Sequence, residues 1–184
     1  MTSSASANAG LSAGAGNAPV AAAPLIRRMA AFLYEGVLLF GVLFATGLVY
    51  AVATHQTNGM VHRPGLIATC FLVLGLYFVG MWVRVGQTLA MKTWHLRVVD
   101  AQGHPLTPWR ALARYLACWV WFLPPFVAAA WLDPKSAAVD FGLPLAWIVV
   151  YALASRLHPR RQFWHDALCG TAVVSARPNK PLPQ

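Results

Sequence analysis

Residues 29–53, MAAFLYEGVLLFGVLFATGLVYAVA, decide the fold: the 25-residue stretch contains a single charged side chain, that of Glu35. The hydrocarbon core of a bilayer requires a helix of about 20 apolar residues, so this stretch is predicted to cross a membrane. The whole chain of 184 residues is 58% hydrophobic and 10% charged, against about 25% charged in ordinary soluble domains. This composition excludes a simple soluble enzyme, and it excludes a disordered chain, which would be poor in apolar residues.

Three further apolar stretches follow along the chain. Residues 65–83 carry no charge, and residues 108–131 are apolar around Arg114 but contain Pro124 and Pro125. Residues 137–155 are the weakest stretch, because Gly142 and Pro144 interrupt a short apolar run that also fits a re-entrant or interfacial segment. We predict an all-α membrane protein with four transmembrane helices at about 29–53, 65–83, 108–131 and 137–155.

The positions of the basic residues predict the orientation. Of the 14 Lys and Arg residues, only Arg63 and Lys135 lie in the first and third links, and the rest lie on the other side. Cytoplasmic segments of membrane proteins carry the Lys and Arg excess, so we expect both termini in the cytoplasm. With three crossings the basic residues would divide evenly, so their distribution favours the fourth helix. The net charge of +9 then lies beside the anionic leaflet, and nucleic acid is not needed as a partner.

The remaining organisation is simple. Residues 1–24 and 177–184 are interpreted as flexible tails, and residues 25–176 as one transmembrane domain. Arg27 and Arg28, followed by an apolar stretch, also resemble a twin-arginine export signal, but the stretch is longer than the 7–15 apolar residues of a signal peptide.

The cytoplasmic segments contain β-like pieces. Residues 94–100 are rich in β-forming residues and precede a turn, and Thr107 with Pro108 is typical of a helix start. Residues 162–168 are predicted to form a short helix ended by Gly170, and residues 171–174 a short strand. The two strand-like pieces could pair on the cytoplasmic face.

Four motifs occur in order. The first motif is Arg28, Ala31 and Glu35. The second is Gly86-Gln87-Thr88-Leu89, followed by Lys92 and by Arg97-Val98-Val99-Asp100. The third is Arg114, and the fourth is His165-Asp166 with Gly170-Thr171. Together they resemble the RDD family of bacterial membrane proteins, named for one arginine and two aspartates. The resemblance covers residues 25–176 and implies a multi-pass protein of the inner membrane, for which transport of an ion or small ligand has been proposed. Two departures are Glu35, where the family has aspartate, and Ala90, where it usually has glycine.

The resemblance identifies the candidate site residues. The signature charges are Arg28, Glu35, Arg114 and Asp166, and the cytoplasmic motif contributes Gln87, Thr88, Lys92, Arg97 and Asp100. A charged side chain at the centre of a transmembrane helix costs about 2.5–3.5 kcal/mol on insertion scales. Glu35 is therefore either an ion or proton site or half of a fixed salt bridge. Matched depth makes Arg114 its expected partner, which leaves Arg28 to pair with Asp166 or to extend to the lipid headgroups.

Other chemistry is not predicted. His55 and His62 have no acid or cysteine nearby to complete a metal site. His165 beside Asp166 suggests an acid–base pair, but no nucleophile has a motif around it, and neighbouring residues of a helix point in different directions. We expect no enzymatic activity, no cofactor and no metal.

Two functions fit these features. The first is permeation or transport of a small solute or ion, by an oligomer because four helices enclose little volume. The alternative is a non-catalytic scaffold that binds a cytoplasmic protein through the basic face around Lys92, Arg97 and Arg110. An acid that must titrate favours transport, and an acid that is permanently paired favours the scaffold.

Overall fold

A computed structural model describes residues 21–55, 63–131 and 138–176. The chain is mostly helical, and its elements run in the order α1 (Leu25–Ala53), α2 (Arg63–Arg84), α3 (Leu89–Thr93), β1 (Leu96–Asp100), α4 (Pro108–Cys118), η1 (Trp119–Trp121), α5 (Leu123–Trp131), η2 (Ala138–Gly142), α6 (Leu143–Ala154), α7 (Trp164–Leu168) and β2 (Thr171–Ser175). Three helical segments in the described residues are long and apolar enough to cross a membrane, namely α1, α2 and Pro108–Ala129, and α6 is a shorter apolar helix.

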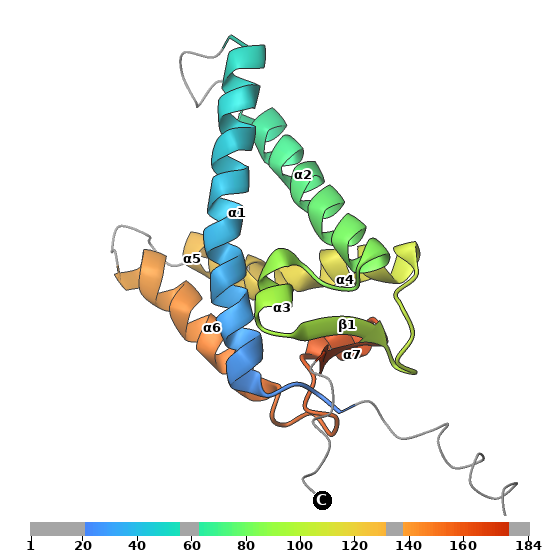
Figure 1. Ribbon diagram of the computed structural model, residues 1–184. Helices are drawn as coiled ribbons and strands as arrows, with labels where there is room; N and C mark the ends of the chain where they lie inside the picture. The colour runs from blue at the N-terminus through green and yellow to red at the C-terminus, as the bar shows by residue number, and fades with distance from the viewer. Residues whose placement is uncertain (1–20, 56–62, 132–137, 177–184) are drawn as a thin grey trace, which may run out of the picture.

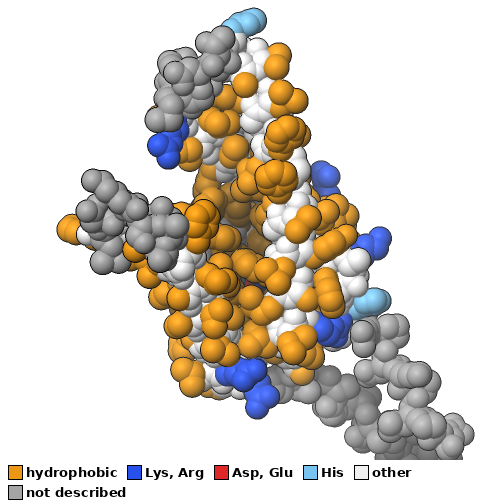
Figure 2. All heavy atoms as spheres, turned by 90° about the vertical axis from the view of Figure 1, so that its left-hand side faces the viewer, with side chains coloured by type: hydrophobic (Ala, Val, Ile, Leu, Met, Phe, Trp, Pro, Cys, Tyr) orange, Lys and Arg blue, Asp and Glu red, His pale blue; other side chains and the backbone are white. Residues whose placement is uncertain are grey.

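Helices α1 and α2 form a tall antiparallel hairpin, and α4 packs across the lower end of α2 (Figure 1). Helix α1 begins one turn earlier than predicted, because Pro24 provides an extended residue directly before it. Arg28 therefore lies within the helix. The outward side of α1 carries exposed apolar side chains such as Val37 and Phe44, as expected for a surface in contact with lipid, and Figure 2 shows apolar side chains along this face of the molecule.

The third predicted helix is broken. It begins at Pro108 as predicted, with the Thr107 side chain accepting a hydrogen bond from the Arg110 amide, but the helical turn η1 separates α4 from α5. Pro124 has no N–H to donate to the Val120 carbonyl four residues earlier. The Trp147 indole on α6 donates to that carbonyl instead, at 3.0 Å. The break thus becomes a contact between η1 and α6.

The fourth apolar stretch is helical from 138 to 154, against a prediction of 137–155. Its first turn, η2, is a π-helical turn that leads into α6. The base of α6 packs against the first turns of α1 through a cluster of buried side chains around Trp121, Tyr151 and Phe163.

The two strand-like pieces do pair, as the sequence suggested. Strands β1 and β2 are antiparallel, with Leu96 opposite Ser175 and Asp100 opposite Thr171. The Ala23 amide donates to the Val173 carbonyl at 3.0 Å, which holds the start of α1 to the same sheet. Three segments far apart in the sequence therefore meet at one end of the molecule.

Short helices complete this end. The predicted helix at 162–168 forms as α7, and Gly170 follows it with φ +63°. Helix α3 was not predicted; Thr88 caps it by accepting a hydrogen bond from the Met91 amide at 3.3 Å.

Candidate functional site

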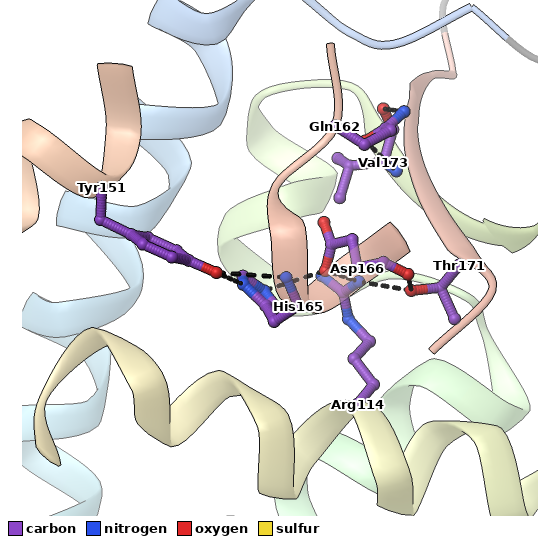
Figure 3. A network of polar contacts seen from close by, with 7 residues as sticks. All are labelled: Arg114, Tyr151, Gln162, His165, Asp166, Thr171 and Val173. Carbon is purple, nitrogen blue, oxygen red and sulfur yellow. Dashed lines mark hydrogen bonds and ion pairs between the residues drawn. The ribbon is translucent and has the colours of Figure 1, made fainter. Parts of the chain in front are cut away.

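Three of the four signature charges fall into two separate buried groups, and Arg28 lies outside both. The Glu35 site consists of Glu35, Tyr77 and Thr88, and the Asp166 cluster consists of Arg114, Tyr151, His165, Asp166 and Thr171. The predicted ion pair between Glu35 and Arg114 is wrong, because Arg114 pairs with Asp166 instead. Helix α1 begins earlier than predicted, so the two residues do not lie equally far along their helices. The Arg114 side chain extends toward α7 (Figure 3).

The Glu35 site brings an acid of α1 against two neutral hydroxyls. The Tyr77 hydroxyl of α2 donates to Glu35 Oε1 at 2.7 Å, and the Thr88 hydroxyl donates to Oε2. Thr88 is fully buried and Glu35 is 8% exposed. Within the described part of the chain, no Lys, Arg or His forms an ion pair with Glu35. The carboxylate is therefore hydrogen-bonded but has no countercharge.

The Asp166 cluster is a chain of charged and polar groups (Figure 3). Arg114 Nη1 donates to Asp166 Oδ1 and, at 3.0 Å, to the Thr171 hydroxyl. The Thr171 hydroxyl in turn donates to the Asp166 carbonyl at 3.1 Å. His165 Nε2 lies 2.9 Å from the same Asp166 oxygen, and His165 Nδ1 lies 2.9 Å from the Tyr151 hydroxyl. The cluster thus ties α4, α6 and α7 to the first residue of β2.

The charges in this cluster stabilise one another. Burial would raise the pKa of Asp166, but Arg114 and His165 outweigh it and lower the pKa of that carboxyl. Burial would likewise lower the pKa of His165, but the Asp166 carboxylate raises it well above the usual value. His165 and Asp166 do meet, although neighbours on a helix were expected to point apart.

Arg28 is not the partner of Asp166 that the sequence predicted. Its Nη2 donates to the Arg161 carbonyl at 2.8 Å, and its Cζ lies 4.3 Å from the centroid of the Phe163 ring. The side chain is 6% exposed, so it packs against the protein instead of extending away from it. Arg28 acts on Asp166 only through a longer-range electrostatic interaction.

Asp100 closes the turn after β1. Its Oδ1 accepts hydrogen bonds from the amides of Gln102 at 2.9 Å and His104 at 2.8 Å, and its Oδ2 lies 3.3 Å from Arg110 Nη1. Desolvation would raise the pKa of Asp100, but these backbone and charge contacts lower it. Asp100 therefore stabilises the turn after β1.

The other residues of the cytoplasmic motif lie around α3. Gly86 has φ +73°, a left-handed conformation that residues other than glycine adopt only with strain. Gln87 is half-buried, whereas Lys92 and Arg97 are exposed. Of this motif, only Thr88 reaches a signature acid.

A cavity of about 650 Å³ adjoins both groups. Its walls are mostly apolar side chains of α1, α2, α5 and the end of α4, and Figure 2 shows the apolar face hollowed between these helices. Arg28, Glu35, Arg114 and His165 also line it. Among the described residues, no three His, Cys, Asp or Glu side chains gather closely enough to hold a metal ion.

The comparison with known families agrees with these motifs. The sequence model of the RDD family matches residues 22–170. The chain belongs to the RDD family. No curated protein and no solved structure matches it. As an RDD protein with long apolar helices, the chain is an integral membrane protein. The matched range includes all four signature charges of this RDD protein and ends just before β2.

Sequence reasoning missed three hydroxyl groups of the two sites, those of Tyr77, Tyr151 and Thr171. Tyr77 and Tyr151 each bring a hydroxyl into an apolar helix, and a buried tyrosine hydroxyl usually finds a hydrogen-bond partner. That signal could have pointed to both residues. Thr171 was noted only as part of the Gly-Thr motif. Its contact with Arg114 depends on the β1–β2 pairing, which sequence spacing does not place.

Proposed function

We propose that this RDD protein moves a small solute or ion across the bacterial inner membrane, and that Glu35 binds the transported or coupling cation or proton. One observation carries the proposal: the Glu35 carboxylate in α1 is held by two neutral hydroxyls instead of a basic side chain. Acids in membrane helices are costly and commonly mark ion pathways or proton relays. An acid without a fixed countercharge can accept an exchangeable one.

The position of Glu35 supports access from the cavity. Its side chain lines the cavity between the helices, and Thr88, which contacts its carboxylate, begins the cytoplasmic helix α3. Glu35 therefore lies between a membrane cavity and the cytoplasmic segments. The exposed apolar surface of α1 supports assembly of several copies, which would enclose a larger pathway than one chain does.

We also infer four crossings with both termini in the cytoplasm. The support is the pairing of β1 with β2 and of Ala23 with Val173, because segments that touch lie on the same side of the membrane. An even number of crossings must then separate β1 from β2. The helical run 138–154 rises about 25 Å at 1.5 Å per residue, close to the thickness of the hydrocarbon core.

Reporter fusions test this topology. Fusions at Asn58 and Lys135 should report the periplasmic side, and fusions at Gln102 and Asn179 the cytoplasmic side. Positions 58, 135 and 179 lie outside the described residues. A periplasmic signal at Asn179 would contradict the four-crossing topology.

Flux through liposomes tests transport. Purified full-length protein, reconstituted and offered a panel of monovalent cations, protons and small solutes, should show flux that Glu35→Gln abolishes and Glu35→Asp, the family residue, retains. Tyr34→Phe, a change on the outward side of the same helix, should leave flux unchanged. Absence of flux from folded wild-type protein across the panel, or unchanged flux in Glu35→Gln, would contradict the proposal.

A scaffold remains the second candidate, and a specific observation favours it. The cytoplasmic end is a folded unit of α3, α7 and the two strands, and it presents the exposed basic side chains of Lys92, Arg97 and Arg110. If this unit binds a protein partner, reversing the charges of Lys92 and Arg97 should abolish capture of that partner and leave flux intact. Neither function includes a chemical step catalysed by the protein.

A further inference from the structure

The charged end of the cavity contains hydrogen-bond donors without acceptors. Arg28, Trp82 and Arg114 all line this cavity, and they are 6%, 2% and 3% exposed. Arg28 Nε and Nη1, Trp82 Nε1 and Arg114 Nε have no hydrogen-bond partner among the described residues. Buried donors in proteins are nearly always hydrogen-bonded, so three side chains lining one cavity point to an acceptor-rich ligand.

The nearby acids leave too few acceptors for these donors. Both oxygens of Glu35 accept hydroxyl hydrogen bonds, and Asp166 Oδ1 is shared by Arg114 and His165. Asp166 Oδ2 is buried without a hydrogen-bond partner among the described residues, and this single oxygen cannot satisfy the four unpaired donor atoms. Arg28 has only the longer-range interaction with that same carboxylate. The end of the cavity next to β2 therefore carries more positive than negative charge, which suits an anionic group.

The rest of the cavity suits a hydrocarbon chain. Its walls are built largely from apolar side chains, including Leu39, Phe40, Phe122 and Phe126. Along α1 the lining extends from Arg28 to Leu43, which is about 22 Å at 1.5 Å per residue. One leaflet of a bilayer contributes about half of the roughly 30 Å hydrocarbon core, so an acyl chain fits this length.

We propose that the cavity binds one anionic phospholipid of the cytoplasmic leaflet, with its phosphate at Arg28 and one acyl chain between α1 and α5. The unpaired donors are covered by neighbouring side chains, so the phosphate reaches them after side-chain rotation, which is fast on the scale of lipid exchange. Charge complementarity selects an anionic head group over a zwitterionic one. The proposal rests on the cavity and does not depend on transport.

Native mass spectrometry of the full-length protein in mild detergent tests this site with phosphatidylglycerol and phosphatidylcholine of identical chains. Wild-type protein should bind phosphatidylglycerol about tenfold more tightly, because the positive end of the cavity repels the quaternary ammonium group that phosphatidylcholine carries beside its phosphate. Arg28→Gln should reduce the ratio to about one. Arg160→Gln, a change at an exposed arginine of the same end, should leave the ratio unchanged.

A second variant keeps the test decisive if Arg28→Gln does not fold. Gly36 lines the cavity, and a Cβ there meets no atom within 4 Å. Gly36→Leu should therefore fill the cavity without a clash and lower phosphatidylglycerol binding about tenfold. Gly41→Leu is the matched control, since its Cβ is equally free and Gly41 does not line the cavity.

Three outcomes would overturn the lipid site. The first is equal binding of the two lipids by wild-type protein, and the second is full binding of phosphatidylglycerol by Gly36→Leu. The third is full competition by water-soluble glycerol phosphate, which would show that the acyl chain is not recognised. Flux that survives any of these results would leave the proposed transport function standing.

Discussion

The two buried acids of this RDD protein are compensated in opposite ways. Asp166 shares one oxygen between the Arg114 guanidinium and the His165 ring, and it is fully buried. Glu35 is almost as buried, yet its partners are the neutral hydroxyls of Tyr77 and Thr88. Asp166 therefore forms a permanent link between elements, whereas the Glu35 carboxylate can bind an exchangeable cation or proton.

The largest effect is expected at Asp166. Asp166→Asn removes the carboxylate that Arg114 and His165 share, and an uncompensated buried charge costs about 3–5 kcal/mol. We expect the midpoint of thermal unfolding in detergent to fall by roughly 10 °C, at about 2–4 °C per kcal/mol. Asp100→Asn, at a more exposed turn, should lower it much less. A melting point within 2 °C of wild type would show that the cluster is not a structural link.

A double-mutant cycle sharpens the comparison by locating the charge pairs. Arg114→Leu and Asp166→Asn should show a coupling energy of about 1–3 kcal/mol, because their side chains are in contact. Arg114→Leu and Glu35→Gln should be additive within about 0.5 kcal/mol, since they share no partner. Thermal unfolding of the single and double variants provides both values. A coupling energy of about 1–3 kcal/mol between Glu35 and Arg114 would instead support the ion pair that the sequence predicted.

Removal of a hydroxyl tests the Glu35 site. Tyr77→Phe deletes the hydrogen bond to Glu35 Oε1, and a hydrogen bond to a charged group contributes about 1.5–3 kcal/mol. We expect destabilisation at the low end of this range, because Thr88 still donates to the carboxylate. Tyr34→Phe removes a half-exposed hydroxyl on α1 and should have no measurable effect. Equal melting points for the two variants would rule out the Tyr77–Glu35 bond.

The pH dependence of stability should follow the Asp166 cluster. The pKa of His165 is raised above its unfolded value of 6.5, so its contribution is complete below pH 6.5 and is lost as pH rises through the folded pKa. The pKa of Asp166 is lowered from 3.8, so its contribution is present above pH 3.8 and is lost at more acidic pH. Melting curves should show a decline on the alkaline side that His165→Gln removes. An alkaline decline that persists in His165→Gln would assign it to another group.

The sequence predicts the elements of this fold better than their contacts. Apolar length identified the helices, and Thr107 with Pro108 located the start of α4 correctly. The break at Trp119–Trp121 was not predicted, although Pro124 and Pro125 were its visible cause. A proline removes a hydrogen bond, but only the structure shows that Trp147 replaces it.

Arg28, Glu35, Arg114 and Asp166 stay predicted site residues, and the structure shows that all four are buried. Both ion pairs expected among them were wrong. The position of a residue along a helix does not determine which neighbouring element its side chain faces. Arg114 faces α7, where it pairs with Asp166. The partner of Glu35 also depends on α3, a five-residue helix whose position is set by its packing against α1. No local pattern encodes that contact.

We propose that Glu35 is needed for transport and that Asp166 is needed for the stability of the fold. One paired measurement on Glu35→Gln tests this difference. Melting in detergent and flux in liposomes should be measured on the same preparation. The amide of glutamine can still accept a hydrogen bond and removes no countercharge from a partner, so the melting point should stay within about 3 °C of wild type while flux is lost. A melting point lowered as far as in Asp166→Asn, with flux retained by the folded fraction, would contradict the claim.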